Sequence, residues 1–204
     1  MENTFEVTSG AIVCSDPCYT LDTWCMGIVE NVKNGTWVAD IERMDVDGWG
    51  NRIAVLEVRH IDHTNVGFDF NEHLPFTGGV DSGQFGFFDK AFYRNDESAK
   101  DLEKYDFSSD FDKEDGDIWY RACCQKTLGE ESWGVLPNGA VSSSGFGDGS
   151  YDVFGVKNKD GEYVAFAVVY IWDDEDEDEG EVCGVCNEEY MDCTCDDDEE
   201  TEEE

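Results

Sequence analysis

The sequence predicts a mostly β fold, an antiparallel sandwich or partly open barrel with one short helix, followed by a small acidic C-terminal tail. Short runs of β-branched and aromatic residues recur between turn signals, and residues suited to a helix are confined to one segment. The end of the chain is almost purely acidic. The 204 residues therefore fit one β-rich domain, residues 1–172, and an appendage, residues 173–204.

Eight segments have the residue pattern of strands. They are residues 4–8, 11–15, 36–41, 52–59, 84–88, 140–143, 152–157 and 163–172. Asn34-Gly35 and residues 158–161 supply residues that accept positive φ, so both predict tight hairpin turns. Residues 165–169 are apolar on both faces, which places the last strand near the centre of the core.

One helix is expected between the fifth and sixth of these strands, counted from the start of the chain. Residues 93–117 are rich in Asp, Glu, Lys and Ser, and this composition predicts a long surface excursion. Residues 117–128 are compatible with a helix, and Asp117 is a candidate N-cap. Within this helix Cys123 and Cys124 are expected to belong to a buried face, because adjacent cysteines form a disulfide only with strained geometry.

The net charge of -37 limits the classes of partner. The tail holds 19 of the 50 acidic residues and has no Lys or Arg, so the body and the tail contribute -18 and -19. Such a surface repels phosphate backbones, which argues against direct nucleic-acid binding and favours a basic protein or a nucleic-acid-binding protein as partner. We find no signal peptide and no long apolar run, and therefore expect a cytoplasmic protein that does not interact with membranes.

Four cysteines in the tail have the spacing of a zinc knuckle spanning residues 182–195. Cys183, Cys186, Cys193 and Cys195 follow the pattern C-x-x-C, six residues, then C-x-C. Four thiolates can bind one tetrahedral zinc, and they leave no open coordination position for catalysis. We therefore predict one structural zinc; the alternative is a disordered tail whose thiols are free or redox-active.

Three segments of the body place a carboxylate in a turn between strands: residues 15–19, 79–84 and 144–151. Their candidate ligand-binding residues are Asp16, Cys18, Asp81, Ser82, Gln84, Asp148 and Tyr151. Alternating glycines at the third segment allow a sharp turn that leaves backbone amides free for a ligand. The alternative is a set of tight turns held by Asx hydrogen bonds.

Over most of residues 5–170 the chain resembles an uncharacterised bacterial and phage family that is described only as a domain of unknown function. Its members carry an "SG…DPCY" segment, a central "VDSGQ" and a late "SGxGDGxY". Here these are Ser9-Gly10 with residues 16–19, residues 80–84 and residues 144–151. The resemblance implies a β-rich fold and a phage or mobile-element origin, and it transfers no activity. The acidic tail looks like an addition to the family pattern.

Catalytic chemistry has few candidates in this sequence. Asp16, Asp81 and Asp148 could converge on a divalent cation or act as acid and base, and Cys18 could be a nucleophile. His60 and His63 have a spacing that could hold a metal, although such a pair more often lies at an exposed strand end.

The sequence leaves three functions open. The first is a binding or interaction protein that engages a basic partner through its acidic tail. The second is a small-molecule binding or hydrolytic domain that uses the aspartate and glycine motifs, and it requires Asp16, Asp81, Asp148 and Tyr151 to lie close together. The third is an acidic DNA mimic that inhibits a nucleic-acid enzyme.

Overall fold

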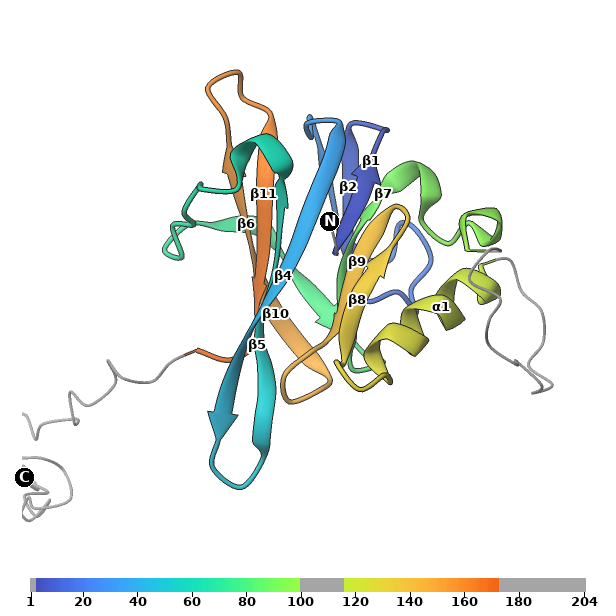
Figure 1. Ribbon diagram of the computed structural model, residues 1–204, viewed down its shortest axis with the longest axis vertical. Coiled ribbons are helices and arrows are strands. Elements are labelled where there is room, and N and C mark those ends of the chain that lie inside the picture. The colour runs from blue at the N-terminus through green and yellow to red at the C-terminus, as the bar shows by residue number, and fades with distance from the viewer. Residues whose placement is uncertain (1–2, 100–115, 173–204) are drawn as a thin grey trace, which may run out of the picture. The chain divides into compact units, whose positions relative to one another are not determined.

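The computed structural model describes residues 3–99 and 116–172, and its strands and helix all belong to the compact unit Met1–Ile171 (Figure 1). The tail with its four cysteines lies outside the described residues. The strands form a six-stranded and a five-stranded sheet, and every strand pairing in these two sheets of the described part is antiparallel. The prediction of a mostly β, antiparallel fold is confirmed, and neither sheet closes into a barrel in this part of the chain.

The six-stranded sheet has the order β1-β4-β5-β11-β10-β6. Its strands are β1 Thr4–Val7, β4 Gly35–Val46, β5 Gly50–His60, β6 His73–Val80, β10 Gly149–Lys157 and β11 Tyr163–Val169. The five-stranded sheet has the order β3-β2-β7-β9-β8. Its strands are β2 Ala11–Ser15, β3 Gly27–Glu30, β7 Gln84–Asp89, β8 Trp133–Leu136 and β9 Gly139–Ser143. Three single-turn 3-10 helices are η1 Ile61–His63, η2 Lys90–Phe92 and η3 Asp96–Ser98.

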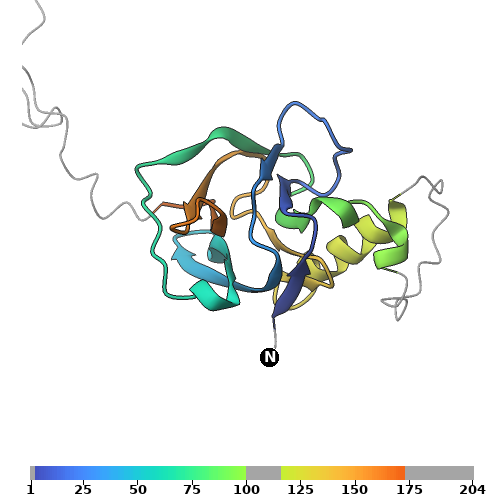
Figure 2. The ribbon, with the colours of Figure 1, turned by 90° about the horizontal axis from the view of Figure 1, so that it is seen from above.

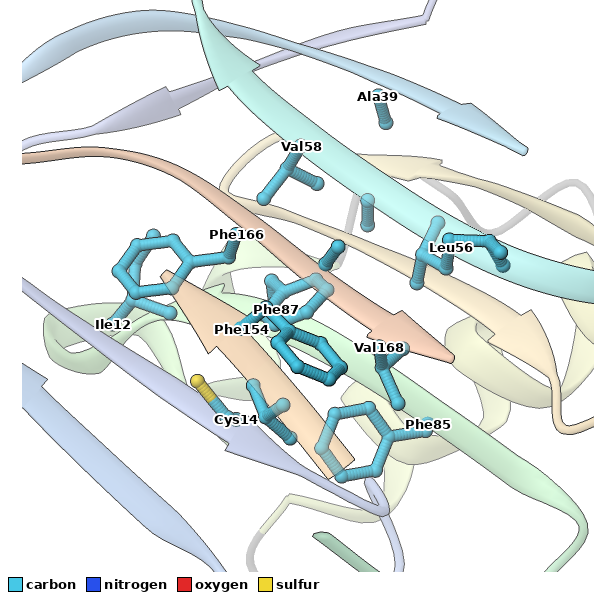
Figure 3. Packing of buried hydrophobic residues seen from close by; sticks show 14 of the residues in the cluster. Ile12, Cys14, Ala39, Leu56, Val58, Phe85, Phe87, Phe154, Phe166 and Val168 are labelled. Carbon is cyan, nitrogen blue, oxygen red and sulfur yellow. The ribbon is translucent and has the colours of Figure 1, made fainter. Parts of the chain in front are cut away.

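The main core lies between the two sheets (Figure 3). A stack of aromatic rings crosses it: Phe166 of β11 lies between Trp37 of β4 and Phe87 of β7, with ring centroids 5.9 Å apart in each pair. All three side chains are fully buried. Because β11 occupies an interior position of its sheet and is buried along nearly its whole length, the predicted central place of the last strand is confirmed.

The helix α1, Asp117–Thr127, forms a third layer on the other face of the five-stranded sheet (Figures 1 and 2). Trp119 and Cys123 pack with Phe88 of β7 in a second, smaller core. The helix and the burial of Cys123 agree with the sequence, whereas Cys124 is only half-buried. The predicted cap is wrong, because Asp117 is the first helical residue. Asp96 caps the helix instead, and its carboxylate accepts hydrogen bonds from the backbone N–H groups of Gly116 and Trp119.

Two turn predictions have different outcomes. Residues 158–161 form the connection between β10 and β11, as expected of a hairpin. Asn34-Gly35 does not form a hairpin, because β3 and β4 belong to different sheets and the chain crosses between them here. Gly35 does have a positive φ of 129°, and a Cβ at this position would lie 2.9 Å from the His60 ring. The residue pattern therefore predicted the positive φ of Gly35 but not that the chain passes from one sheet to the other here.

Candidate functional site

The three motif segments meet at one end of the two sheets. Asp16 directly follows β2, residues 81–83 connect β6 to β7, and residues 144–148 connect β9 to β10. The second and third of these segments each carry the chain from one sheet to the other. Hydrogen bonds link all three, and the backbone N–H of Ser144 also donates to the carbonyl oxygen of Gly83 at 3.1 Å. The structure therefore brings the predicted site residues into one junction.

Asp16 lies at the centre of this junction and is fully buried. Its Oδ2 accepts hydrogen bonds from the backbone N–H groups of Asp81 at 2.9 Å and Ser82 at 2.7 Å. Its Oδ1 accepts from the backbone N–H of Cys18 at 2.8 Å and the hydroxyl of Ser82 at 2.6 Å. Four donors satisfy the buried carboxylate, which thus holds two turns together.

Gln84 extends the network toward the helix. Its Nε2 donates to the Ser82 hydroxyl at 3.1 Å and approaches the Cys124 sulfur at 3.5 Å, while its Oε1 accepts from the Thr127 hydroxyl at 2.9 Å. The side chains of Gln84 and Thr127 are both buried. Gln84 therefore ties the start of β7 to the C-terminal turn of α1.

Asp148 and Tyr151 fix the third motif segment. The carboxylate of Asp148 accepts a hydrogen bond from the backbone N–H of Gly83 at 3.2 Å. The Tyr151 hydroxyl donates to the carbonyl oxygens of Gly147 at 2.7 Å and Ser144 at 3.2 Å. Asp148 is exposed and Tyr151 is half-buried. These hydrogen bonds close the turn of the third motif segment and attach it to the turn that contains Gly83.

Two residues that the sequence did not single out complete the junction. The hydroxyl of Tyr93 is within hydrogen-bond distance of the carbonyl oxygens of Tyr19 at 2.8 Å and Asp16 at 3.2 Å. The guanidinium of Arg94 donates to the carbonyl oxygens of Pro17 and Cys18, each at 3.1 Å. Neither residue belongs to a recognisable motif, and their role depends on a contact about 75 positions away.

The pKa values of three side chains near Asp16 are raised. Burial, with the nearby Asp16 carboxylate, raises the pKa of Cys18 to about 12. Burial also raises the pKa of Tyr120 to about 12. Burial, together with a hydrogen bond to Asp81, raises the pKa of Tyr19. A thiol in this state is a poor nucleophile at neutral pH.

Next to the junction two aromatic side chains are exposed on loops that lie far apart in the sequence. Trp49 is in the turn between β4 and β5, and Phe146 is in the loop between β9 and β10. Both connections lie toward the lower end in the view of Figure 1. Their rings meet edge to face at a centroid distance of 5.6 Å, although Trp49 is 58 % exposed and Phe146 48 % exposed. The Arg52 guanidinium lies 5.7 Å from the centre of the Trp49 ring.

Exposed carboxylates lie on the same two loops and on the loop after α1. Asp47 is in the same turn as Trp49, and Asp148 is in the same loop as Phe146. Glu131 is in the loop after α1, which is attached to β4 because the Arg43 side chain donates to the Glu131 carbonyl oxygen. None of these three carboxylates has an ion pair with another described residue. We call Trp49, Phe146, Asp47, Asp148 and Glu131 the acidic aromatic surface.

The described residues provide no metal site of three or more His, Cys, Asp or Glu side chains. His60 is buried; its Nε2 is 3.1 Å from the carbonyl oxygen of Asn34, and its Nδ1 accepts from the backbone N–H of Asp62. His60 is therefore part of a strand-end cap with His63 packed against its ring. The predicted zinc ligands Cys183, Cys186, Cys193 and Cys195 lie outside the described residues.

None of the helices in the described ranges is long and apolar enough to cross a membrane. No curated protein and no solved structure matches the chain. A family model described as "Protein of unknown function (DUF4241)" matches residues 5–168, a range that contains all three motif segments and all of both sheets except Thr4 and Val169. The expected membership in a family of unknown function is thereby confirmed, and the chain belongs to the DUF4241 family.

Proposed function

We propose that this protein is a cytoplasmic interaction protein that binds a basic polypeptide through the acidic aromatic surface. The observation that carries the proposal is the exposed Trp49–Phe146 pair, whose loops also carry exposed carboxylates that form no ion pair with another described residue. Exposed aromatic residues that contact each other across two loops leave apolar surface in water without filling a core. Exposed apolar patches of this kind mark interaction sites. Tryptophan in particular is enriched among residues that dominate binding energy.

The charges favour a basic partner. Aromatic faces attract guanidinium and ammonium groups, and carboxylates form short charge-assisted hydrogen bonds with them. The net charge of -37 adds a long-range attraction that accelerates association with a cationic partner. In this proposal the buried Asp16 junction acts as a support, because it fixes the loop that carries Phe146 and Asp148.

The test uses a fluorescent peptide of alternating Arg and Gly residues and fluorescence anisotropy at physiological salt. Replacing Trp49 and Phe146 together by Ala should weaken binding at least tenfold, the usual effect of removing interface aromatic anchors. The matched control is Trp24→Ala, since Trp24 is 93 % exposed and makes no ring contact with another described residue. Equal affinity of the double variant and the wild type would exclude the acidic aromatic surface.

The tail is expected to contribute to the same function. Residues 173–204 carry 19 acidic residues, and the predicted structural zinc would order the part around the four cysteines. Removing these residues should abolish capture of the partner while the β-rich domain stays folded. Capture that is unchanged after truncation would show that the tail does not take part.

A small-molecule binding or hydrolytic function is the second candidate, since Asp16, Asp81, Asp148 and Tyr151 do belong to one junction. The chemistry of the junction favours it less. All four hydrogen bonds of the Asp16 carboxylate go to the protein itself, and Cys18 is held as a thiol. Hydrolysis of a panel of ester, amide and phosphate substrates that disappears in Ser82→Ala would favour this candidate.

The third candidate, a DNA mimic of phage origin, rests on the net charge and on the resemblance to a bacterial and phage family. It predicts an inhibitor whose complex with a nucleic-acid enzyme competes with duplex DNA and weakens steeply with salt. A complex that is insensitive to salt would count against it.

A further inference from the structure

A hollow separate from the motif junction lies between strand β10 and the loop that precedes β6. It has a volume of about 190 Å³, and its lining includes Phe68, Asp69 and Glu72 of the loop together with Phe154 and Val156 of β10. Gly67 and Gly155 contribute backbone at its rim. No function considered so far uses this site.

The volume limits what the hollow can hold. Pockets for whole small-molecule ligands usually measure about 300 to 1,000 Å³. A hollow of 190 Å³ is therefore suited to one group the size of an amino-acid side chain. A nucleotide or a larger cofactor would not fit.

The walls are preorganised by a chain of aromatic contacts. Phe70 stacks on Phe68 at 5.8 Å and meets Phe154 edge to face at 5.1 Å. The Arg59 guanidinium lies over Phe68 at 4.9 Å, and Arg59 also donates to the carbonyl oxygen of Val66. These contacts attach the loop to the sheet, so a ligand would meet apolar walls already in place.

Asp69 and Glu72 give the lining of the hollow negative charge. Asp69 Oδ1 accepts two hydrogen bonds from Asn71, both at 3.0 Å, and these lower the pKa of Asp69. No ion pair to another described residue engages Asp69 or Glu72. Lys157 also lines the hollow, but its ammonium lies over the Tyr163 ring at 4.6 Å. The lining of the hollow therefore combines apolar side chains, Phe68, Phe154 and Val156, with the two carboxylates of Asp69 and Glu72.

We propose that this hollow binds an alkylammonium group, with the aliphatic chain against Phe68, Phe154 and Val156 and the ammonium against Asp69 and Glu72. A chain of four or so carbons fits the volume and uses both the apolar and the anionic parts of the lining. Two sources supply this chemistry, a free aliphatic amine or the side chain of a lysine in another polypeptide. The site does not depend on the acidic aromatic surface, and either can fail without the other.

The test is an amide NMR titration of the full chain with n-butylammonium chloride. Saturable shifts of the Gly67 and Gly155 signals are expected, with a Kd on the order of 1 mM for so small a ligand. 1-Butanol, which has the same chain without the charge, should bind at least tenfold more weakly. Equal binding of the alcohol, or no shift at Gly67 and Gly155 with the amine, would overturn the proposal.

Variants locate the site. Gly67→Leu should abolish binding by filling the hollow, and it should fold, because a Cβ at Gly67 meets nothing within 4 Å. Asn65→Leu adds the same side chain at an exposed position that does not line the hollow and should bind as the wild type does. Glu72→Gln should weaken binding about tenfold, whereas Glu42→Gln, an exposed carboxylate on β4, should not. Binding retained by Gly67→Leu would place the amine elsewhere and refute the assignment.

The source of the amine is decided by a second pair of probes. Nα-acetyl-lysine-N-methylamide represents a lysine within a polypeptide, and the norleucine analogue lacks its charge. Shifts at Gly67 and Gly155 with the lysine probe would assign the site to a polypeptide partner. Shifts with n-butylammonium but not with the lysine probe would assign it to a free aliphatic amine. Each result supports the alkylammonium site and selects one source.

Discussion

Asp16 shows how one buried side chain can account for two of the three sequence motifs. Its carboxylate accepts hydrogen bonds from the backbone of Cys18, Asp81 and Ser82, so the first two turns are shaped around it, and the third is attached to Gly83 of the second turn. The sequence predicted that Asp16 lies in a turn, and it left open whether the carboxylate faces a ligand or the backbone. That choice depends on a turn 65 positions away, which no local pattern encodes.

We expect Asp16→Asn to lower the free energy of unfolding by about 3 kcal/mol. In the variant an amide nitrogen replaces a carboxylate oxygen that accepts two hydrogen bonds in the wild type. Its N–H groups would then point at other buried hydrogen-bond donors. Urea denaturation measures the change. Asp148→Asn is the control, since Asp148 is exposed, and its cost should stay below about 1 kcal/mol. Similar costs for the two variants would contradict the central role of Asp16.

His60 should make stability depend on pH. Burial lowers its pKa, and Lys33 and His63 lower it further, against opposing effects of the Asn34 carbonyl and Asp62. The unfolded chain therefore binds a proton at this position before the folded protein does, and stability is lost as pH falls below about 6.5. In urea denaturation between about pH 7.5 and pH 5.5, His60→Gln should reduce this loss.

The exposed His73 supplies the comparison for that experiment. His73→Gln should retain the slope of stability against pH seen in the wild type. The His60 imidazole should also titrate below the ordinary histidine pKa of about 6.5 when it is followed by NMR. A His60 that titrates at or above that value would disprove the assignment of a neutral buried ring.

At the scale of elements, the strands that the sequence missed share one property. The eight predicted segments all correspond to strands, whereas β3, β6 and β8 were not predicted, and each is an edge strand of its sheet. An edge strand is hydrogen-bonded to a neighbouring strand along one edge only, so it tolerates residues that interior strands exclude. In β6 the sequence contains Pro75 and two adjacent glycines, which resemble a turn. Local pattern therefore identified the interior of each sheet better than its margins.

The glycines of β6 are required by packing rather than by a turn. A Cβ at Gly78 would overlap the ring of the buried Phe85. We expect Gly78→Ala to lower the free energy of unfolding by about 1 to 3 kcal/mol, since the ring has to shift within a filled core. Thermal unfolding gives the comparison with Gly67→Ala, whose Cβ has open space and should change stability little. A neutral effect of Gly78→Ala would mean that the core here is loosely packed.

For the molecule as a whole, the sequence predicted the β-rich body and its family, while the arrangement of two sheets and a covering helix depends on pairings between distant segments. Strand β2, for example, pairs with β7, and the chain reaches β7 from β6, which belongs to the other sheet. The acidic aromatic surface was also beyond sequence reasoning, because Trp49 and Phe146 are brought together only by the fold.

The zinc knuckle remains a prediction at this scale. Elemental mass spectrometry of the full chain, purified without added zinc, should find about one zinc per molecule. Serine at positions 183, 186, 193 and 195 should remove it, because each serine deletes a thiolate ligand. Serine at Cys18 and Cys124, two half-buried cysteines of the body, should leave it unchanged. Metal retained by the tail variant would place the binding site in the body.

The Asp16 junction also limits how early during synthesis the chain can complete its fold. Asp16 accepts a hydrogen bond from Asp81, 65 positions later in the chain. Gly83 of the same turn donates a hydrogen bond to Asp148, which lies a further 65 positions along. At roughly 5 to 20 residues per second, ribosomal synthesis needs on the order of ten seconds to pass from the first of these residues to the last. The backbone N–H groups of Asp81 and Ser82 that enclose the Asp16 carboxylate are made about halfway through this interval, and Asp148 only at its end. The junction therefore cannot be complete before Asp148 has been synthesised.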